Sequence, residues 1–274
     1  MPIPRSRAST PIALVTDFGY RDHYAGVIRG VIASIAPTAP VIDITHGIPA
    51  QSVTAGALLL RESWRYFPKR TIFVAVVDPG VGTARRPIAI ETSSGARFIG
   101  PDNGVLWPAA EQAGYRRAVE LRSARYRLKD VSSTFHGRDI FAPAAAHLWF
   151  GTRLSMLGPA LEQIEKLGFG EVEEVSGELR GTIIYVDGFG NLVSNIDRES
   201  FARFSSRFAS QTLFVTMDDG TPIELYDTYG DAPEGTLLAL FGSFQMLEIA
   251  VREGSAAERF AVTPGAPVMV RVKR

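Results

Sequence analysis

The sequence contains no cysteine, which excludes disulfides, zinc–thiolate sites and thiol nucleophiles. It contains only four histidines, and the other three do not lie at ligand spacing from His136. Asp139, three residues after His136, is the one acidic neighbour that would make half of a metal site with it. A metal centre needs further ligands of this kind. We therefore expect neither a metal nor a cofactor.

Net charge and long apolar runs are also missing. The 29 basic and 29 acidic residues cancel, whereas a sequence-independent nucleic-acid binder needs a basic excess. The Arg-rich stretch 116–129 is interpreted as a solvated helix face and loop. No apolar run approaches the ~20 residues that span a bilayer, and the polar stretch Met1 to Ser9 does not resemble a signal peptide. We expect a soluble, cytoplasmic protein with no nucleic-acid or membrane partner.

The first half of the chain alternates apolar runs with amphipathic segments. Strands are predicted at Ile12–Thr16, Val41–Thr45, Thr71–Val77, Pro87–Thr92 and Arg97–Ile99, and helices at Tyr24–Ile35, Val53–Trp64, Phe141–Phe150 and Met156–Leu161. The strand–helix–strand order is typical of an α/β domain. The nearly all-apolar third strand suits a parallel strand covered on both faces. The fold class is therefore predicted as α/β, with a mostly parallel N-terminal sheet.

The pattern changes at the acidic, aperiodic stretch Phe169 to Glu178. Short strand-like runs follow it, separated by Asp-Gly, Gly and Pro turns, at Gly181–Val186, Leu213–Met217, Ile223–Tyr226, Leu237–Phe241, Met246–Val251 and Val268–Val272. This spacing indicates a small antiparallel sheet or barrel. We predict an N-terminal α/β domain over residues 1–170 and a smaller antiparallel β-barrel domain over residues 171–274.

Acidic residues fall where predicted parallel strands end, and ligands of open α/β sheets bind beyond those ends. Asp17 opens the turn after the first strand, where it either binds a ribose diol or caps the next helix. Asp43 lies near the end of the second strand. Asp78 opens D-P-G-V-G-T-A-R-R, in which Arg85 and Arg86 can reach back to its carboxylate. From the pattern alone, an Asp–Arg pair here is as readily structural as catalytic.

Two further segments each have two interpretations. His136, in S-S-T-F-H-G-R-D-I-F-A-P, is either a packed residue or a catalyst. The segment V-D-G-F-G-N is either a hairpin turn or a polar clamp. In the clamp, Asp187 faces an ammonium group, Asn191 faces a carboxylate or amide edge, and Phe189 forms an apolar wall.

Taken together, these segments resemble the S-adenosyl-L-methionine hydrolase (adenosine-forming) family, also called SAM hydroxide adenosyltransferases. The shared motifs here are T-D-F-G, D-P-G-V-G-T-x-R, G-P-D-N-G, F-H-G-R-D-x-F-A-P, D-x-F-G-N and G-S-F-x-x-L-E-I-A. Each is weak by itself, but six in family order make a specific match. The resemblance runs from about Pro11 to Val272.

The resemblance implies a homotrimer whose substrate lies between the N-terminal domain of one subunit and the C-terminal domain of a neighbour. It implies that Asp78, Arg85 and His136 are catalytic. It also implies a set of substrate-binding residues, with Asp17 on the ribose, Asp187 and Asn191 on the methionine part, and others along the adenine-side wall. That set comprises Asp17, Phe18, Asp22, Asp187, Phe189, Asn191, Ser243, Phe244, Glu248 and Val251. The chain departs from the family at Gln245-Met246, where Gly-Tyr is common, and at Arg252-Glu253, where Asn-Gly is common.

The halogenating relatives, fluorinase and chlorinase, carry Tyr at the position of Asp78 and Tyr-Ser in place of His136-Gly137. A carboxylate repels a halide and accepts a hydrogen bond from water. The resemblance therefore implies hydrolysis of S-adenosyl-L-methionine to adenosine and methionine. The alternative is a protein that binds adenosine or S-adenosyl-L-methionine as a sensor, which would not need Asp78, Arg85 and His136 together.

Overall fold

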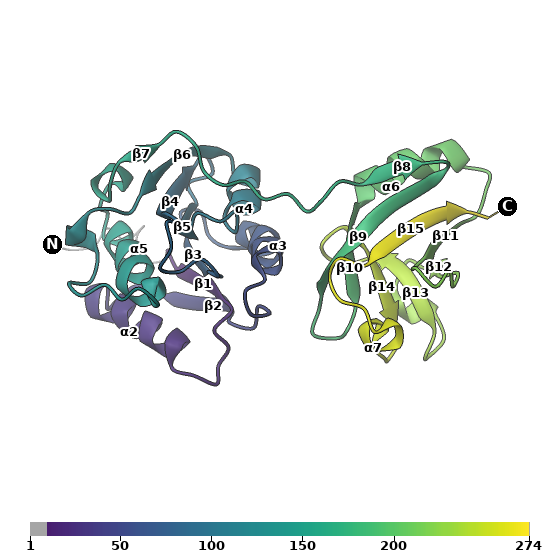
Figure 1. The fold of residues 1–274 in the computed structure, drawn as a ribbon, viewed down its shortest axis with the longest axis horizontal. Coiled ribbons are helices and arrows are strands. Elements are labelled where there is room, and N and C mark those ends of the chain that lie inside the picture. The colour runs from purple at the N-terminus through teal and green to yellow at the C-terminus, as the bar shows by residue number, and fades with distance from the viewer. Residues whose placement is uncertain (1–9, 274) are drawn as a thin grey trace. The chain divides into compact units, whose positions relative to one another are not determined.

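The computed structural model describes residues 10–273. The chain divides into two compact units, one ending at Leu167 and the other beginning at Gly168 (Figure 1). No helix within residues 10–273 combines the length and apolar character needed to cross a bilayer.

The first unit contains a seven-stranded sheet. Its strands, in spatial order, are β2 (Val41–Thr45), β1 (Ile12–Thr16), β3 (Ile72–Val76), β5 (Arg97–Pro101), β4 (Pro87–Thr92), β6 (Tyr115–Glu120) and β7 (Ala160–Leu161). The pairs β2–β1, β1–β3 and β3–β5 are parallel, whereas β5–β4, β4–β6 and β6–β7 are antiparallel. The prediction of a mostly parallel sheet was wrong, and the sheet is mixed. The cause is the tight turn at residues 93–96, because a parallel connection needs a dozen or more residues.

Helices cover both faces of this sheet (Figure 1). They are α2 (Tyr24–Ile35), α3 (Val53–Ser63), α4 (Trp107–Gln112) and α5 (Ala142–Trp149), the last preceded by a π-helical turn at Gly137–Phe141. Ile12 and Leu14 of β1 share one core cluster with residues of α2 and α5. On the opposite face α3 packs closely, and a Cβ on Gly56 would lie 2.9 Å from a methyl group of Val77. All five residues of β1 and of β3 are buried, as expected for strands covered on both faces.

Two local predictions in this unit were wrong. The helix predicted over Met156–Leu161 is a 3-10 turn at Leu154–Met156 followed by the strand β7. Gly158 lies between them at φ 157°, where a Cβ would fall 1.9 Å from the Glu120 carbonyl oxygen, so the backbone approach excludes a helix. The stretch 116–129, interpreted as a helix face and loop, instead contributes β6 and a 3-10 turn at Ala124–Tyr126.

The second unit is built on an eight-stranded sheet. Its main path is β11 (Leu213–Thr216), β15 (Pro267–Val272), β9 (Glu178–Val186), β10 (Leu192–Asp197), β14 (Met246–Val251), β13 (Leu237–Phe241) and β12 (Glu224–Leu225), with β8 (Glu173–Val175) paired to β9. Val215 and Ile223 exchange backbone hydrogen bonds of 2.9 and 2.8 Å, which joins β11 to the chain just before β12. The sheet is therefore nearly barrel-shaped.

The prediction of a wholly antiparallel second sheet was wrong for one pair, because β12 runs parallel to β13. An eleven-residue connection, 226–236, joins the two strands in place of a tight hairpin turn. The sequence patterns also missed β10 and two short helices, α6 (Arg198–Ser205) and α7 (Ala256–Phe260). The core of this unit is lined by apolar side chains of the sheet and by Phe204 of α6.

Candidate active site

Asp17 and Asp78 leave the first sheet at the same edge. Asp17 directly follows β1 and Asp78 comes two residues after β3, and these strands are parallel neighbours with Thr16 opposite Val76. The carboxyl ends of such strands are where α/β sheets bind ligands. A cavity of about 370 Å³ opens here. It is lined by Asp17, Phe18, Tyr24, Ala50, Gln51, Val76, Asp78, Pro79, Val81, Thr134, Phe135, His136 and Gly137.

Arg85 joins Asp78 to His136. Its Nε donates to Asp78 Oδ1 at 2.9 Å, its Nη2 donates to Asp78 Oδ2, and the same Nη2 lies 2.9 Å from His136 Nδ1. The Arg85 and Asp78 side chains are only 7% and 6% exposed. A buried bidentate pair of this kind has a strongly restricted geometry. The 78–85 turn and the loop before His136 thereby bring three polar side chains together.

A glycine makes this approach possible. Gly82 has φ 79°, and a Cβ there would lie 2.6 Å from the Ser133 carbonyl oxygen. Only glycine tolerates both the backbone conformation and the contact. Arg86, the second candidate in the same turn, points elsewhere, because its guanidinium binds Asp102 and the carbonyl oxygen of Gln163. Arg85 is therefore the arginine of this site.

The protonation state of His136 follows from its partner. A guanidinium has donors only, so His136 Nδ1 must accept the hydrogen bond and the ring proton lies on Nε2. Burial, and next the positive charge of Arg85, lower the pKa of His136. The imidazole is thus neutral at physiological pH, and its available lone pair faces Arg85. Asp78 also accepts from Arg85 on both oxygens, but each carboxylate oxygen has a second lone pair that can take a proton.

We expect turnover to stay constant across neutral pH. It should decrease only at pH values below the ordinary histidine pKa of about 6.5. The pKa of His136 is lowered, so the imidazole protonates only at more acidic pH, where it can no longer accept from Arg85. The stability that its neutral form contributes is complete above the unfolded pKa. It is lost as the pH falls from there towards the folded pKa.

The measurement is kcat against pH for the wild type and for His136→Ala, in which this acid limb should disappear. His147→Asn is the matched control, because burial also lowers the pKa of His147 but its side chain does not line the cavity. An unchanged acid limb in His136→Ala would assign the titration to another group.

Asp17 is anchored by the loop before α3. Its Oδ2 accepts from the Gln51 backbone N–H at 2.8 Å, and burial raises its pKa while that hydrogen bond opposes the rise. Phe18 packs edge-on against Phe135, with ring centroids 5.8 Å apart. Asp22, also predicted to bind substrate, is exposed and does not line this cavity.

The alternative of a metal half-site at His136 and Asp139 has no support in the side-chain contacts. The buried Asp139 carboxylate accepts from Arg138 Nε and Nη2 at 2.5 and 2.9 Å and from the Ser132 N–H at 2.8 Å. These bonds occupy both oxygens. Across residues 10–273 we find no group of three His, Asp or Glu side chains arranged to hold a metal ion.

The second unit has its own large pocket, of about 1020 Å³. Seven of the predicted substrate-binding residues line it, namely Asp187, Phe189, Asn191, Ser243, Phe244, Glu248 and Val251. Arg252 and Glu253, one of the two departures from the family pattern, line it as well, whereas Gln245 and Met246 do not. The structure thus divides the predicted site residues between one pocket in each unit.

The two interpretations of V-D-G-F-G-N are compatible. Asp187 Oδ1 accepts from the N–H groups of Phe189 and Asn191, and its Oδ2 accepts from Asn191 Nδ2 at 3.0 Å. The segment is therefore a hairpin turn held by Asp187. The same turn leaves Phe189 82% exposed and holds the Asn191 amide, so a polar and an apolar side chain both line the pocket.

The sequence patterns missed Tyr229. Its hydroxyl donates to Glu248 Oε1 inside the second pocket. Burial and this hydrogen bond raise the pKa of Tyr229, and burial raises the pKa of Glu248. Tyr229 begins a short 3-10 turn in a polar loop, where no periodicity marks it. Only the fold brings this loop to β14.

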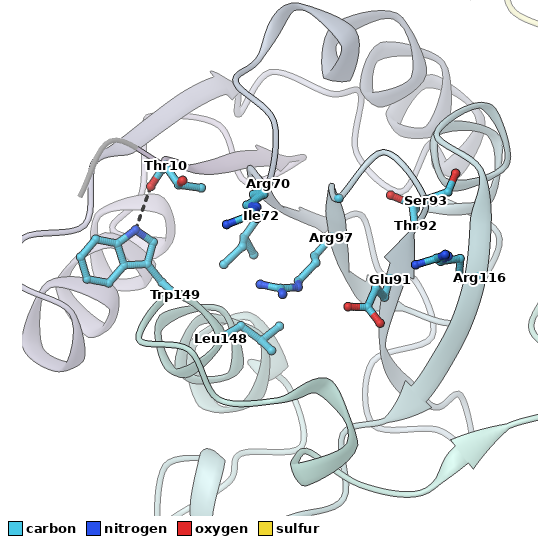
Figure 2. Close-up of a pocket in the computed structure, with 11 residues that line it drawn as sticks. Thr10, Arg70, Ile72, Glu91, Thr92, Ser93, Arg97, Arg116, Leu148 and Trp149 are labelled. Carbon is cyan, nitrogen blue, oxygen red and sulfur yellow. Dashed lines mark hydrogen bonds between the residues drawn. The ribbon is translucent and has the colours of Figure 1, made fainter. Parts of the chain in front are cut away.

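Another cavity, of about 370 Å³, lies at the opposite edge of the first sheet, near the start of β1 and β3 (Figure 2). Arg70, Arg97 and Glu91 line it, and Trp149 Nε1 donates to the Thr10 carbonyl oxygen at 2.8 Å. None of the predicted site residues lies there. The candidate active site is therefore at the edge that carries Asp17 and Asp78.

Two family models match the chain. That of the SAM hydroxide adenosyltransferase N-terminal domain matches residues 12–158, and that of the C-terminal domain matches residues 181–269. The chain is 41% identical over 265 residues to the (R)-S-adenosyl-L-methionine hydrolase of Salinispora arenicola, covering 94% of this chain and 97% of the relative. A protein of the same name from Thermus thermophilus is 36% identical, covering 94% and 98%. The fluorinase of Nocardia brasiliensis is 28% identical, covering 95% and 96%.

Two solved structures are similar along the whole chain. An uncharacterized conserved protein from Thermotoga maritima has a TM-score of 0.87 at 36% identity, covering 95% of this chain and 99% of that one. A conserved hypothetical protein from Thermus thermophilus has a TM-score of 0.76 at 34% identity, covering 96% and 100%.

Proposed function

Because the chain belongs to the SAM hydroxide adenosyltransferase family, we propose that it hydrolyses S-adenosyl-L-methionine to adenosine and L-methionine. Relatives named (R)-S-adenosyl-L-methionine hydrolase that match almost end to end support this activity. The observation that carries it within this chain is the buried contact of Asp78, Arg85 and His136 at the carboxyl end of β3. A sensor is not favoured, since binding alone would not require this arrangement.

The proposed hydrolysis needs polar side chains beside the attacking water molecule. Methionine leaves the sulfonium as a neutral thioether and needs no acid. Water is the difficult partner, because it must lose a proton as its oxygen bonds to the ribose C5′ and the C5′–S electron pair passes to sulfur. In our proposal Asp78, Arg85 and His136 hold this water in line with the C5′–S bond.

The three side chains take different parts in this proposal. Alignment of the water contributes ~7–11 kcal/mol, and a positioned base contributes roughly 10²–10⁴-fold. Arg85 stabilises hydroxide character. Asp78 accepts the proton, because the single lone pair of His136 Nδ1 faces Arg85 whereas each Asp78 oxygen keeps a second one. The His136 Nε2–H remains as a donor to orient the water.

The same carboxylate argues against halogenation. Asp78 is 6% exposed and carries its charge at the position where the halogenating relatives carry Tyr. A halide beside this charge would be repelled. The identity to the fluorinase, 28%, is also lower than to the hydrolases, 36–41%.

The product assay tests the activity directly. Purified protein incubated with S-adenosyl-L-methionine of known sulfonium configuration should form adenosine and methionine, without added metal and unaffected by EDTA. In oxygen-18 water the label should enter the adenosine 5′-hydroxyl. Unlabelled adenosine would rule out attack by water at C5′, and 5′-halogenated product in halide buffer would favour the other branch of the family.

We also propose that the two units are the functional domains predicted at residues 1–170 and 171–274. We further propose that the protein is a cytoplasmic homotrimer with sites formed between subunits. The division of the predicted binding residues between two pockets, one in each unit, supports a composite site. In such a composite site, one subunit provides the pocket of the first unit and a neighbouring subunit provides the pocket of the second.

Complementation is the expected consequence of a site shared between subunits. Asp78→Asn disables the pocket of the first unit, and Asn191→Ala disables that of the second. Co-expressed, the two inactive variants should form mixed trimers in which some sites are intact, and activity should return. Light scattering should give a mass near three chains. Full activity in a monomer, or mixed trimers as inactive as either parent, would contradict the shared site.

A further inference from the structure

A series of polar contacts, buried at Thr16 and His46, lies behind the loop that carries Asp17. The Phe18 N–H donates to Thr16 Oγ1 at 3.2 Å, and Thr16 Oγ1 lies 2.7 Å from His46 Nδ1. His46 Nε2 lies 3.3 Å from Asp43 Oδ1, and Asp43 Oδ2 accepts from Arg29 at 2.5 Å. The His46 and Thr16 residues are completely buried. None of Thr16, His46, Asp43 or Arg29 lines the cavity, so the proposed mechanism leaves these contacts unused.

The Asp43 carboxylate can only accept, so the His46 Nε2 that faces it at 3.3 Å carries the ring proton. With its proton on Nε2, the ring accepts at Nδ1 from the Thr16 hydroxyl, whose oxygen accepts from the Phe18 N–H. His46 Nε2 and Asp43 Oδ1 are buried and have no hydrogen-bond partner in the described part of the chain, so their 3.3 Å contact is electrostatic. Arg29 supplies the positive charge that balances Asp43.

His46 also ties the two loops that meet at Asp17. Its carbonyl oxygen accepts from the Gly19 N–H at 2.7 Å, which fixes the loop after β1. The chain continues from His46 to Gln51, whose N–H binds the Asp17 carboxylate at 2.8 Å. His46 thus contacts the loop after β1 at two points, through its ring at Thr16 and through its carbonyl oxygen at Gly19.

We propose that His46, acting through Thr16, is a positioning residue that holds the Asp17 carboxylate in its binding geometry. This inference rests on the proposed function, in which Asp17 binds the ribose. A purely structural His46 would stabilise the unit but leave ligand affinity unchanged. A positioning His46 affects KM and leaves kcat nearly unchanged, because Asp78, Arg85 and His136 belong to other segments.

Thr16→Val is the most direct test, because it keeps the side-chain shape and removes the hydroxyl. We expect KM for S-adenosyl-L-methionine to rise about fivefold to tenfold, as for the loss of one buried hydrogen bond, with kcat within about twofold of the wild type. Thr16→Ser, which retains the hydroxyl, should restore KM. The affinity for adenosine, measured by calorimetry, should fall by the same factor as KM rises.

Thr71→Val is the matched control. Thr71 is equally buried, precedes β3 at the opposite edge of the sheet, and donates its hydroxyl to the Pro68 carbonyl oxygen at 2.7 Å. It should lose stability as Thr16→Val does but keep its KM. If Thr16→Val does not fold, His46→Phe, which keeps a ring but no nitrogen, should show the same rise in KM.

The two proposals fail in different ways. A wild-type protein that forms no adenosine from S-adenosyl-L-methionine refutes the hydrolase activity, and adenosine affinity then still tests the role of Thr16 and His46. If the wild type is active and KM and adenosine affinity are the same in Thr16→Val and Thr71→Val, the positioning role is refuted. A loss confined to kcat refutes it as well.

Discussion

Asp78→Asn should lower turnover by roughly 10²–10⁴-fold, the contribution of a positioned base. The amide keeps the shape of the side chain but cannot take a proton from water and carries no charge to balance Arg85. Substrate should still bind, because the proposed contacts with Asp17, Asp187 and Asn191 are untouched. Adenosine formation gives kcat, and calorimetry with S-adenosyl-L-methionine gives affinity.

The control for this substitution is Asp130→Asn, which removes a carboxylate from an exposed position that does not line the cavity. It should have wild-type kcat. Near-normal turnover in Asp78→Asn would disprove the proposed role of Asp78 while leaving the family membership intact. Loss of binding together with turnover would instead make Asp78 a substrate-binding group.

Arg85→Met should destabilise the first unit by about 3–5 kcal/mol, the cost of leaving one member of a buried ion pair without its partner. Asp78 is 6% exposed and both its oxygens face Arg85, so its charge would remain buried and uncompensated. The double variant Asp78→Asn/Arg85→Met should recover part of this loss, because it removes the charge. Both variants should be nearly inactive. Recovery of stability in the double variant without recovery of activity would separate the two effects.

Denaturant unfolding followed by tryptophan fluorescence measures this effect. All three tryptophans, Trp64, Trp107 and Trp149, belong to the first unit, so the signal reports the unit that contains Arg85. Arg117→Met is the control, because the Arg117–Glu91 pair has side chains that are 57% and 26% exposed. An exposed pair contributes about 0–1 kcal/mol. Equal losses in Arg85→Met and in the double variant would show that the charge of Asp78 is not the cause.

The apolar and turn patterns of the sequence correctly predicted the elements whose conformation depends on residues nearby in the chain. Apolar runs ending in Asp17 and Asp78 identified β1 and β3 and the ends where they leave the sheet. The glycine-rich turn after Asp78 predicted that an arginine could reach back, and Arg85 does. The same patterns failed for β6, β10 and the residues before β7, where pairing with distant strands decides the conformation.

The sequence by itself determined the family and the division into an N-terminal α/β region and a C-terminal β-rich region. It also supplied a set of site residues, which remain predictions. The tertiary structure decided the sheet order, the choice of Arg85 over Arg86, and the proton position on His136, whose partner lies 51 residues away in the chain. It also decided the contacts of Tyr229 with Glu248 and of His46 with Thr16. These depend on hydrogen bonds between segments far apart in sequence, and such contacts leave no periodicity or spacing in the chain.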